Sequence, residues 1–219
     1  MIGGGYEDQP GLGISRLAHY AKVFGLGSRL GVDLPGEKPG FIPDPETKKI
    51  TAPNNPTWRI GDTYNVSIGQ GDLRVTPLQI AAATAAIANG GTLWRPYLLD
   101  NFIDGSGRES EAGGACGIRK GVIEERHLLR VRDAMRATVT SGTARALGDI
   151  PMEIAAKTGT AQAGSGKPHA WVTAFAPLEN PEIVITVMVE HAGEGSTIAV
   201  PITHEILKWY YQNRFLAND

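Results

Sequence analysis

Apolar residues recur at helical spacing near the start of the chain. The segment 13–27 reads "GISRLAHYAKVFGLG", and this spacing predicts an amphipathic helix that ends at the closing glycines. The apolar face of this helix consists of Ile14, Leu17, Ala18, Ala21 and Phe24.

The segment 76–91, "TPLQIAAATAAIANGG", carries a full set of helix signals. Thr76 is suited to cap the N-terminus, Pro77 fits the first helical position, and Gln79 stands where it can complete a capping box. An Asn-Gly-Gly sequence supplies the end. The interior is nearly all alanine, so neighbouring elements can approach closely and we expect burial around most of the circumference.

Two stretches of the chain have no clear periodicity. Residues 32–56, "VDLPGEKPGFIPDPETKKITAPNNP", contain repeated proline and glycine, which predicts an ordered surface loop without a regular element that could border a cleft. Residues 104–120, "DGSGRESEAGGACGIRK", are rich in glycine and polar residues, and we expect a mobile loop there.

Two further helices are predicted in the second half of the chain. One starts at the two glutamates of "VIEERHLLRVRDAMRATVTSGTA" and ends at Ser141-Gly142, and the other lies in "IAVPITHEILKWYYQNRFL" and closes the chain. The first is expected to pack through Leu128, Val131, Met135 and Val139, and the second through Ile202, Ile206, Trp209 and Tyr210.

Between these two helices the pattern changes to an alternation of apolar and polar residues. The runs "EIAAKTGTAQ", "AWVTAFAPL" and "EIVITVMVEH" follow each other with short polar connections, which predicts a meander of about three antiparallel strands. The order of elements therefore indicates an α+β fold with packed helices, and a length of 219 residues fits a single domain.

Composition narrows the possible functions. Lys and Arg total 21 against 23 Asp and Glu, with no basic stripe, so we expect no nucleic-acid partner. No apolar run approaches the roughly 18 residues of a membrane span. The only cysteine, Cys116, is expected to be an exposed free thiol. The five histidines lack metal-ligand spacing, and we predict no metal and no other cofactor.

The chemistry of the chain is concentrated in "AAKTGTAQAGSGKP", residues 155–168. A phosphate-binding P-loop requires G-x-x-x-x-G-K-[ST], but Gly166-Lys167 is preceded by Ala161 at the first glycine position and followed by Pro168. Nucleotide binding is therefore disfavoured. The alternative is the K-T-G element of serine acyl-transfer enzymes that react with β-lactams, a tripeptide that is weak evidence without its context.

The residue types of this element suit a carboxylate-terminated peptide. Lys157 would bring positive charge to a cleft, and Thr158 and Thr160 alternate along a strand, so their hydroxyls point the same way. Gly159 would let a peptide lie alongside as an added strand. A backbone N–H beyond the glycine could form half of an oxyanion hole, where each such donor stabilises the transition state by about 2.7 to 4 kcal/mol.

The context is "YNVSIGQGDLRVTPLQ", then "MRATVTSGTA", "IAAKTGTAQ" and "HAWVTAFAP", in an order that resembles the transpeptidase domain of class B penicillin-binding proteins. "GLGSRLGVDLPGEKPGFIPDP" is most similar to the elongation-type enzymes of that class, which act in peptidoglycan biosynthesis and cell shape. The resemblance implies a penicillin-binding/serine β-lactamase-like fold. It also implies a D,D-transpeptidase, in which a serine attacks the D-Ala-D-Ala end of a stem peptide and the acyl group passes to an amine.

The same resemblance assigns roles to residues. Lys157 and Thr160 would be catalytic, with the Thr160 N–H completing the oxyanion hole. Thr158, Gly159, Thr160 and Gln162 would bind the stem peptide or a β-lactam. The parent protein would act extracytoplasmically, on the periplasmic side of the membrane, with an anchor outside this chain.

The family also needs S-x-x-K, which carries the nucleophile, and S-x-N. None of the serines has lysine at the third following position or asparagine at the second. Residues 1–219 therefore resemble the C-terminal part of one transpeptidase domain, and we expect no acylation without the N-terminal half. The incomplete sheet would expose apolar surface and favour self-association. The alternative is a non-catalytic peptide-binding module that keeps only the K-T-G strand.

Overall fold

The computed structural model describes residues 3–4, 8, 10–111, 115–164 and 166–217. The chain divides into two compact units, one made of Met1–Gln79 with Arg95–Ile118 and the other of Ile80–Trp94 with Arg119–Asp219. In the described part of the chain, no helix is both long and apolar enough to cross a bilayer.

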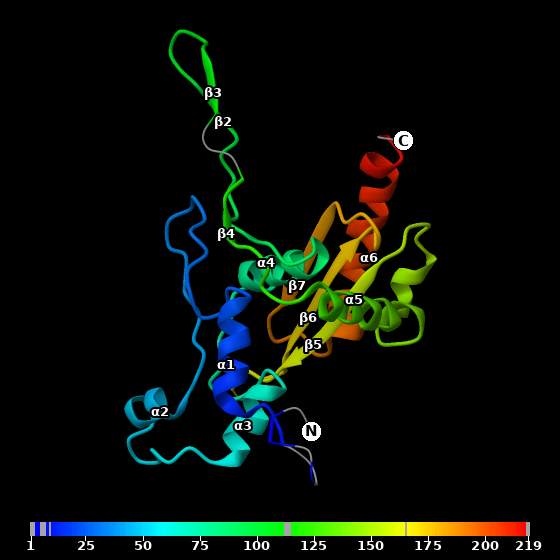
Figure 1. Cartoon of the computed structure of the whole chain (residues 1–219). Helices are drawn as coiled ribbons and strands as arrows, with labels where there is room; N and C mark the ends of the chain where they lie inside the picture. Colours follow the sequence, from blue (N-terminus) through cyan, green and yellow to red (C-terminus); the bar gives the residue numbers. More distant parts are fainter. Residues whose placement is uncertain (1–2, 5–7, 9, 112–114, 165, 218–219) are drawn as a thin grey trace. The chain divides into compact units, whose positions relative to one another are not determined.

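Within its described residues, the first unit contains three short helices and a hairpin (Figure 1). The helices are α1 (Gly13–Val23), α2 (Pro45–Thr51) and α3 (Ile60–Ser67), and the hairpin pairs β2 (Asn101–Ile103) with β3 (Glu109–Glu111). The position of α1 confirms the first predicted helix, and Ile14 and Ala18 are buried as expected. The third helix, α3, was not predicted.

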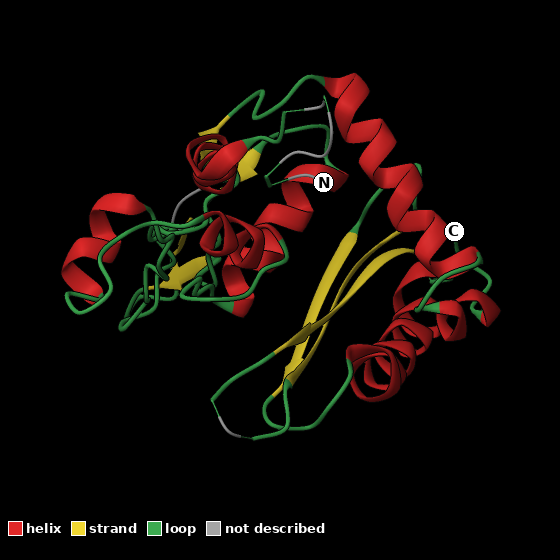
Figure 2. Ribbon diagram, turned by 90° about the horizontal axis from the view of Figure 1, so that it is seen from below, coloured by secondary structure: helices red, strands yellow, loops and turns green. Residues whose placement is uncertain are grey.

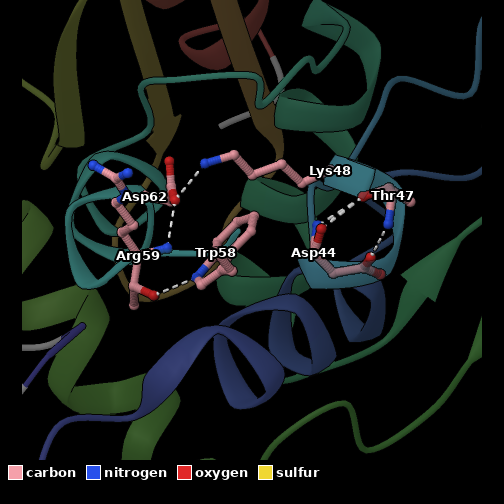
Figure 3. A network of polar contacts seen from close by, with 7 residues as sticks. Asp44, Thr47, Lys48, Trp58, Arg59 and Asp62 are labelled. Carbon is pink, nitrogen blue, oxygen red and sulfur yellow. Dashed lines mark hydrogen bonds and ion pairs between the residues drawn. The ribbon is translucent and has the colours of Figure 1, made fainter. Parts of the chain in front are cut away.

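The prediction that residues 32–56 form no regular element is wrong, because α2 lies within them. Asp44 caps this helix by accepting a hydrogen bond from the Thr47 N–H at 2.8 Å, and the Thr47 hydroxyl accepts from the Asp44 N–H at 2.9 Å (Figure 3). Pro45 takes the first helical turn, where its missing N–H costs nothing. In this segment Pro45 therefore lies at the start of a helix, and proline does not exclude regular structure here.

A polar network joins α2 to α3 within the first unit. Lys48, buried to 8% exposure, lies 2.7 Å from an Asp62 carboxylate oxygen and 5.9 Å from the centre of the Trp58 indole ring (Figure 3). The Lys48 hydrogen bond is the largest cause that lowers the pKa of Asp62. Asp62 also accepts from the Arg59 N–H at the start of α3. One carboxylate thus pairs with a buried lysine and caps a helix.

The alanine-rich helix α4 (Pro77–Ala88) has the predicted boundaries and cap. The Gln79 N–H donates to the Thr76 hydroxyl at 3.1 Å, and the Thr76 N–H donates to the Gln79 side chain at 3.0 Å, which is the capping box expected from the sequence. Only Pro77 in this helix is exposed. Gln79, Thr84, Ala86 and Ala88 are buried and the other residues apart from Pro77 are half-buried, so the expected burial around most of the circumference is only partly confirmed.

The expected mobile loop at residues 104–120 includes β3 and β4 (Gly117–Arg119), so part of this stretch forms short strands. Its mobility stays a prediction, and residues 112–114 lie outside the described residues. Cys116 is an exposed free thiol, as expected. The two-residue strand β1 (Leu93–Trp94) follows α4.

The second unit is built on a three-stranded antiparallel sheet, which confirms the predicted meander. The strands are β5 (Ala155–Ala161), β6 (His169–Ala176) and β7 (Ile183–Val189), paired in the order β5-β6-β7 (Figures 1 and 2). Gly159 lies opposite Trp171, which in turn lies opposite Met188. β5 is therefore at one edge of the described sheet and β7 at the other.

The two faces of this sheet pack against different helices. Along β6, Val172 and Ala174 belong to the core shared with Val200 and Leu207 of α6 (Val200–Tyr210). On the opposite face, Phe175 packs with Ala88 of α4 and with a methionine of α5 (Glu125–Thr140). On that face a chain of hydroxyls also runs from Thr84 through Thr173 to Thr186, at 2.8 and 2.9 Å.

Helix α5 ends before Ser141 as predicted, but one residue of its expected packing face is wrong. Val131 is exposed, whereas Leu128, Met135 and Val139 are buried. Arg132 fits the buried stripe better, because it lies four residues after Leu128 and three before Met135. Its guanidinium donates to the Leu178 carbonyl and lies 5.8 Å from the centre of the Phe175 ring.

The closing helix α6 also packs differently from the prediction. Ile202, Ile206 and Trp209 are 42%, 42% and 54% exposed, while Val200, Thr203 and Leu207 are buried. The helix carries two apolar stripes, and the stripe with the smaller side chains faces the sheet. The Thr203 hydroxyl is satisfied by donating to the Ala199 carbonyl at 3.0 Å. Of the predicted contact residues, Tyr210 does pack against the core.

Three short helical segments complete the second unit. η1 (Arg145–Asp149) is a 3₁₀ turn after α5, and η2 (Gly195–Ala199) and η3 (Tyr211–Phe215) are π-helical turns on either side of α6. His204 of α6 lies 2.8 Å from an Asp149 carboxylate oxygen, which ties the closing helix to η1.

Candidate active-site strand

All five predicted site residues lie on β5 or directly after it, within the second unit. Thr158 pairs with Val172 and Thr160 with Ala170, and paired residues of antiparallel strands share a face. The two threonines therefore lie on the same face, as predicted. Gln162 follows the end of the strand and is exposed.

Lys157 lies on the other face of β5, opposite Thr173. Its side chain is exposed and returns to the strand, where the ammonium donates to the Thr158 carbonyl oxygen at 2.6 Å. A positive charge is thus held beside the backbone of the K-T-G element. The Lys157 ammonium therefore contacts the backbone carbonyl of Thr158, while the side chains of Lys157 and Thr158 lie on opposite faces of β5.

The Thr158 hydroxyl has a partner that the sequence did not suggest. Thr143, in the turn after α5, places its hydroxyl oxygen 2.7 Å from that of Thr158. Both residues keep solvent exposure. The only signal for Thr143 was its place in "MRATVTSGTA", within the stretch that carries the family resemblance.

Thr160 is contacted from η2. The Gly195 N–H donates to the Thr160 hydroxyl oxygen at 3.4 Å. A Cβ atom built on Gly195 would lie 2.3 Å from the Trp171 carbonyl oxygen and 2.4 Å from the Gly159 carbonyl oxygen. Only glycine allows η2 to approach the backbones of β5 and β6 this closely. Gly195 is therefore a second site residue that the sequence analysis missed.

Gly159 itself is also closely packed. A Cβ atom on it would lie 3.3 Å from the Trp171 Cβ, tighter than most real contacts. Because Gly159 has no side chain, β5 presents only its backbone at this position, which would leave room for a peptide alongside it.

The arrangement suits recognition of an extended, anionic ligand. An edge strand offers backbone groups for pairing, an exposed ammonium lies beside it, and two hydroxyls share one face. The described residues contain no group of three or more His, Cys, Asp or Glu side chains that could hold a metal.

Comparison with known proteins identifies the family. The penicillin binding protein transpeptidase domain matches residues 9–208. The chain belongs to this family. The peptidoglycan D,D-transpeptidase MrdA of Haemophilus influenzae is 32% identical over 95% of the chain, and MrdA of Acinetobacter baumannii is 35% identical over 87%. The chain spans about a third of the length of these relatives, 34% and 31%.

Solved structures agree with this assignment. Pseudomonas aeruginosa PBP2 in complex with WCK 5153 shares 34% identity at a TM-score of 0.80, with 93% of this chain and 45% of that chain covered. PBP2 in a complex with MreC from Helicobacter pylori shares 32% identity at a TM-score of 0.73, covering 91% and 36%. The predicted class B resemblance and the α+β transpeptidase fold are therefore confirmed.

Proposed function

We propose that this chain is the substrate-binding part of a peptidoglycan D,D-transpeptidase. The observation that carries the proposal is the K-T-G edge strand, with the Lys157 ammonium held beside the Thr158 backbone and the Thr158 and Thr160 hydroxyls on one face. These groups would bind the terminal carboxylate of a D-Ala-D-Ala stem peptide or the carboxylate of a β-lactam. Gln162, just beyond the strand, would contact the same ligand.

In this proposal the chain positions the substrate and another part of the protein attacks it. The Thr160 N–H would stabilise the oxyanion that forms when a serine adds to the peptide carbonyl. No serine here has the S-x-x-K spacing, so covalent catalysis has no starting atom in these residues. Relatives of this family synthesise peptidoglycan, and the site of action would accordingly be extracytoplasmic.

The remainder of the domain would cover the apolar stripe of α6. Ile202, Ile206 and Trp209 are exposed, and among the described strands β7 pairs only with β6. The chain accounts for 45% of the PBP2 structure it matches, so a large part of that protein has no counterpart here.

We expect the exposed apolar stripe of α6 to mediate self-association of the isolated chain. Sedimentation should show oligomers that Ile206→Lys reduces, and a monodisperse wild-type monomer with one cooperative thermal transition would contradict this.

Direct binding tests the carboxylate site without any chemistry. The 219-residue chain is titrated with an acylated peptide ending in D-Ala-D-Ala and with the same peptide ending in a carboxamide, followed by amide NMR shifts. We expect preference for the carboxylate and a loss of about tenfold in affinity for Lys157→Ala, the order of one charge-assisted hydrogen bond.

Lys167→Ala is the matched control. It removes the same charge from an exposed position in the connection between β5 and β6, ten positions after Lys157 in the chain and outside the K-T-G tripeptide. An equal loss in both variants would mean that general charge attraction, not the K-T-G site, binds the peptide. Equal affinity for carboxylate and carboxamide would overturn the proposal.

A further inference from the structure

Thr143 is held against the K-T-G strand by a tight turn. After α5 ends, the Ser141 N–H donates to the Ala137 carbonyl and the Ala144 N–H donates to the Thr138 carbonyl, both at 3.0 Å. A Cβ atom on Gly142 would lie 2.8 Å from the Thr138 Cα, so a side chain there would open the turn.

The neighbouring residue fixes the turn from the other side. Ala144 is completely buried in the core of the second unit, although Thr143 next to it is exposed. The backbone is thus anchored on both sides of Thr143. The anchored backbone places the Thr143 hydroxyl within hydrogen-bond distance of Thr158.

The hydroxyl pair has one consequence for an anionic ligand. Each hydroxyl has one proton to donate and can accept others, and at 2.7 Å one of the two must donate to the other. A carboxylate can only accept. If Thr158 is to donate to the carboxylate, its oxygen must take its other bond from the Thr143 proton, and this acceptance also strengthens the outgoing bond.

We propose that Thr143 is a positioning residue for carboxylate recognition: it donates to the Thr158 hydroxyl oxygen and thereby directs the Thr158 proton to the ligand carboxylate. The inference rests on the proposed function, because it assigns the Thr158 hydroxyl to the carboxylate. It adds a residue outside the K-T-G element, 15 positions earlier in the chain.

The test uses the same 219-residue chain and the same two peptides. Thr143→Val keeps the branched shape and removes the hydroxyl, and it should bind the carboxylate peptide about three- to tenfold more weakly, the usual range for one hydrogen bond. Binding of the carboxamide peptide should not change. Thr143→Ser restores the hydroxyl and should return to within about twofold of wild type.

Two further variants separate positioning from structural damage. Thr140→Val removes a hydroxyl from the exposed last residue of α5, where it donates to the Ala137 carbonyl of its own helix at 3.5 Å, and should leave binding unchanged. In a Thr158→Val background, Thr143→Val should have no further effect, because the hydroxyl it serves is gone. If Thr143→Val does not fold, Thr143→Ala takes its place in the cycle.

The outcomes distinguish this inference from the proposed function. If the wild-type chain prefers the carboxylate peptide and Thr143→Val binds that peptide equally tightly, the proposed role of Thr143 is overturned and the proposed function is not. A variant that loses both peptides equally, or a loss that Thr143→Ser does not restore, also overturns it. Wild-type chain with no carboxylate preference overturns the proposed function and this inference together.

Discussion

The replacement Gly195→Ala should separate η2 from the K-T-G strand. The added methyl carbon would lie 2.3 and 2.4 Å from two backbone carbonyl oxygens, those of Trp171 and Gly159, whereas real Cβ contacts essentially never fall below 3.0 Å. The backbones must therefore move apart by at least about 0.7 Å to relieve the closer contact, and a strand backbone yields less than the end of a side chain. Overpacking of this kind destabilises by about 1 to 3 kcal/mol, and we expect the upper part of that range.

The assay is urea unfolding followed by far-ultraviolet circular dichroism, with Gly148→Ala as the matched control. A Cβ atom on Gly148, in η1 of the same unit, would meet Val139 at an ordinary 3.8 Å, so this change should stay within about 0.5 kcal/mol of wild type. The Gly195→Ala midpoint should be lower at an unchanged slope. Equal midpoints for the two variants would show that the close approach of η2 to β5 is not a constraint on the fold.

Other predictions concern polar contacts that stabilise each unit. Lys48→Met keeps the apolar stem but leaves Asp62 without its ammonium partner, and should cost about 1.5 to 3 kcal/mol in urea unfolding; a neutral result would mean that desolvation cancels the pair. The pKa values of Asp44 and Asp62 are lowered from 3.8, by the Thr47 N–H and by Lys48 respectively, so their stabilising effect is complete above that value and is lost as pH falls through the folded pKa values. The contribution of these two carboxylates to stability should therefore be constant down to about pH 5 and be lost below about pH 4, and Asp62→Asn should make the loss of stability in acid smaller. Arg132→Met should destabilise the second unit more than Val131→Met, since Arg132 and not Val131 contacts the core beside Phe175.

Local signals in the sequence predicted those elements whose boundaries are set locally. The capping box of Thr76 and Gln79 and the alternation of the three strands were sufficient, because each depends on residues a few positions apart. Asp44 and Thr47 form the same kind of cap at α2, but the prolines that surround them are also typical of irregular loops, so the two signals point in opposite directions.

Choices between faces depend on tertiary packing and could not be read from the sequence. Helix α6 has two apolar stripes, and periodicity alone does not say which one meets the sheet. The candidate site shows the same limit. The K-T-G residues lie next to one another in sequence, but the contacts to Thr158 and Thr160 come from residues 15 and 35 positions away. The contacts of Thr143 and Gly195 depend on tertiary structure, because the turn that follows α5 brings Thr143 to β5 and the segment η2 brings Gly195 to the same strand.

We propose that this chain supplies the carboxylate-binding strand of a serine transpeptidase and that the nucleophile lies elsewhere in the protein. The most direct measurement incubates the full chain with benzylpenicillin and records the intact mass and the backbone amide shifts of the same sample. We expect an unchanged mass together with shifts confined to β5 around Lys157–Thr160. A mass increase by one penicilloyl group, or shifts that leave β5 untouched, would contradict it.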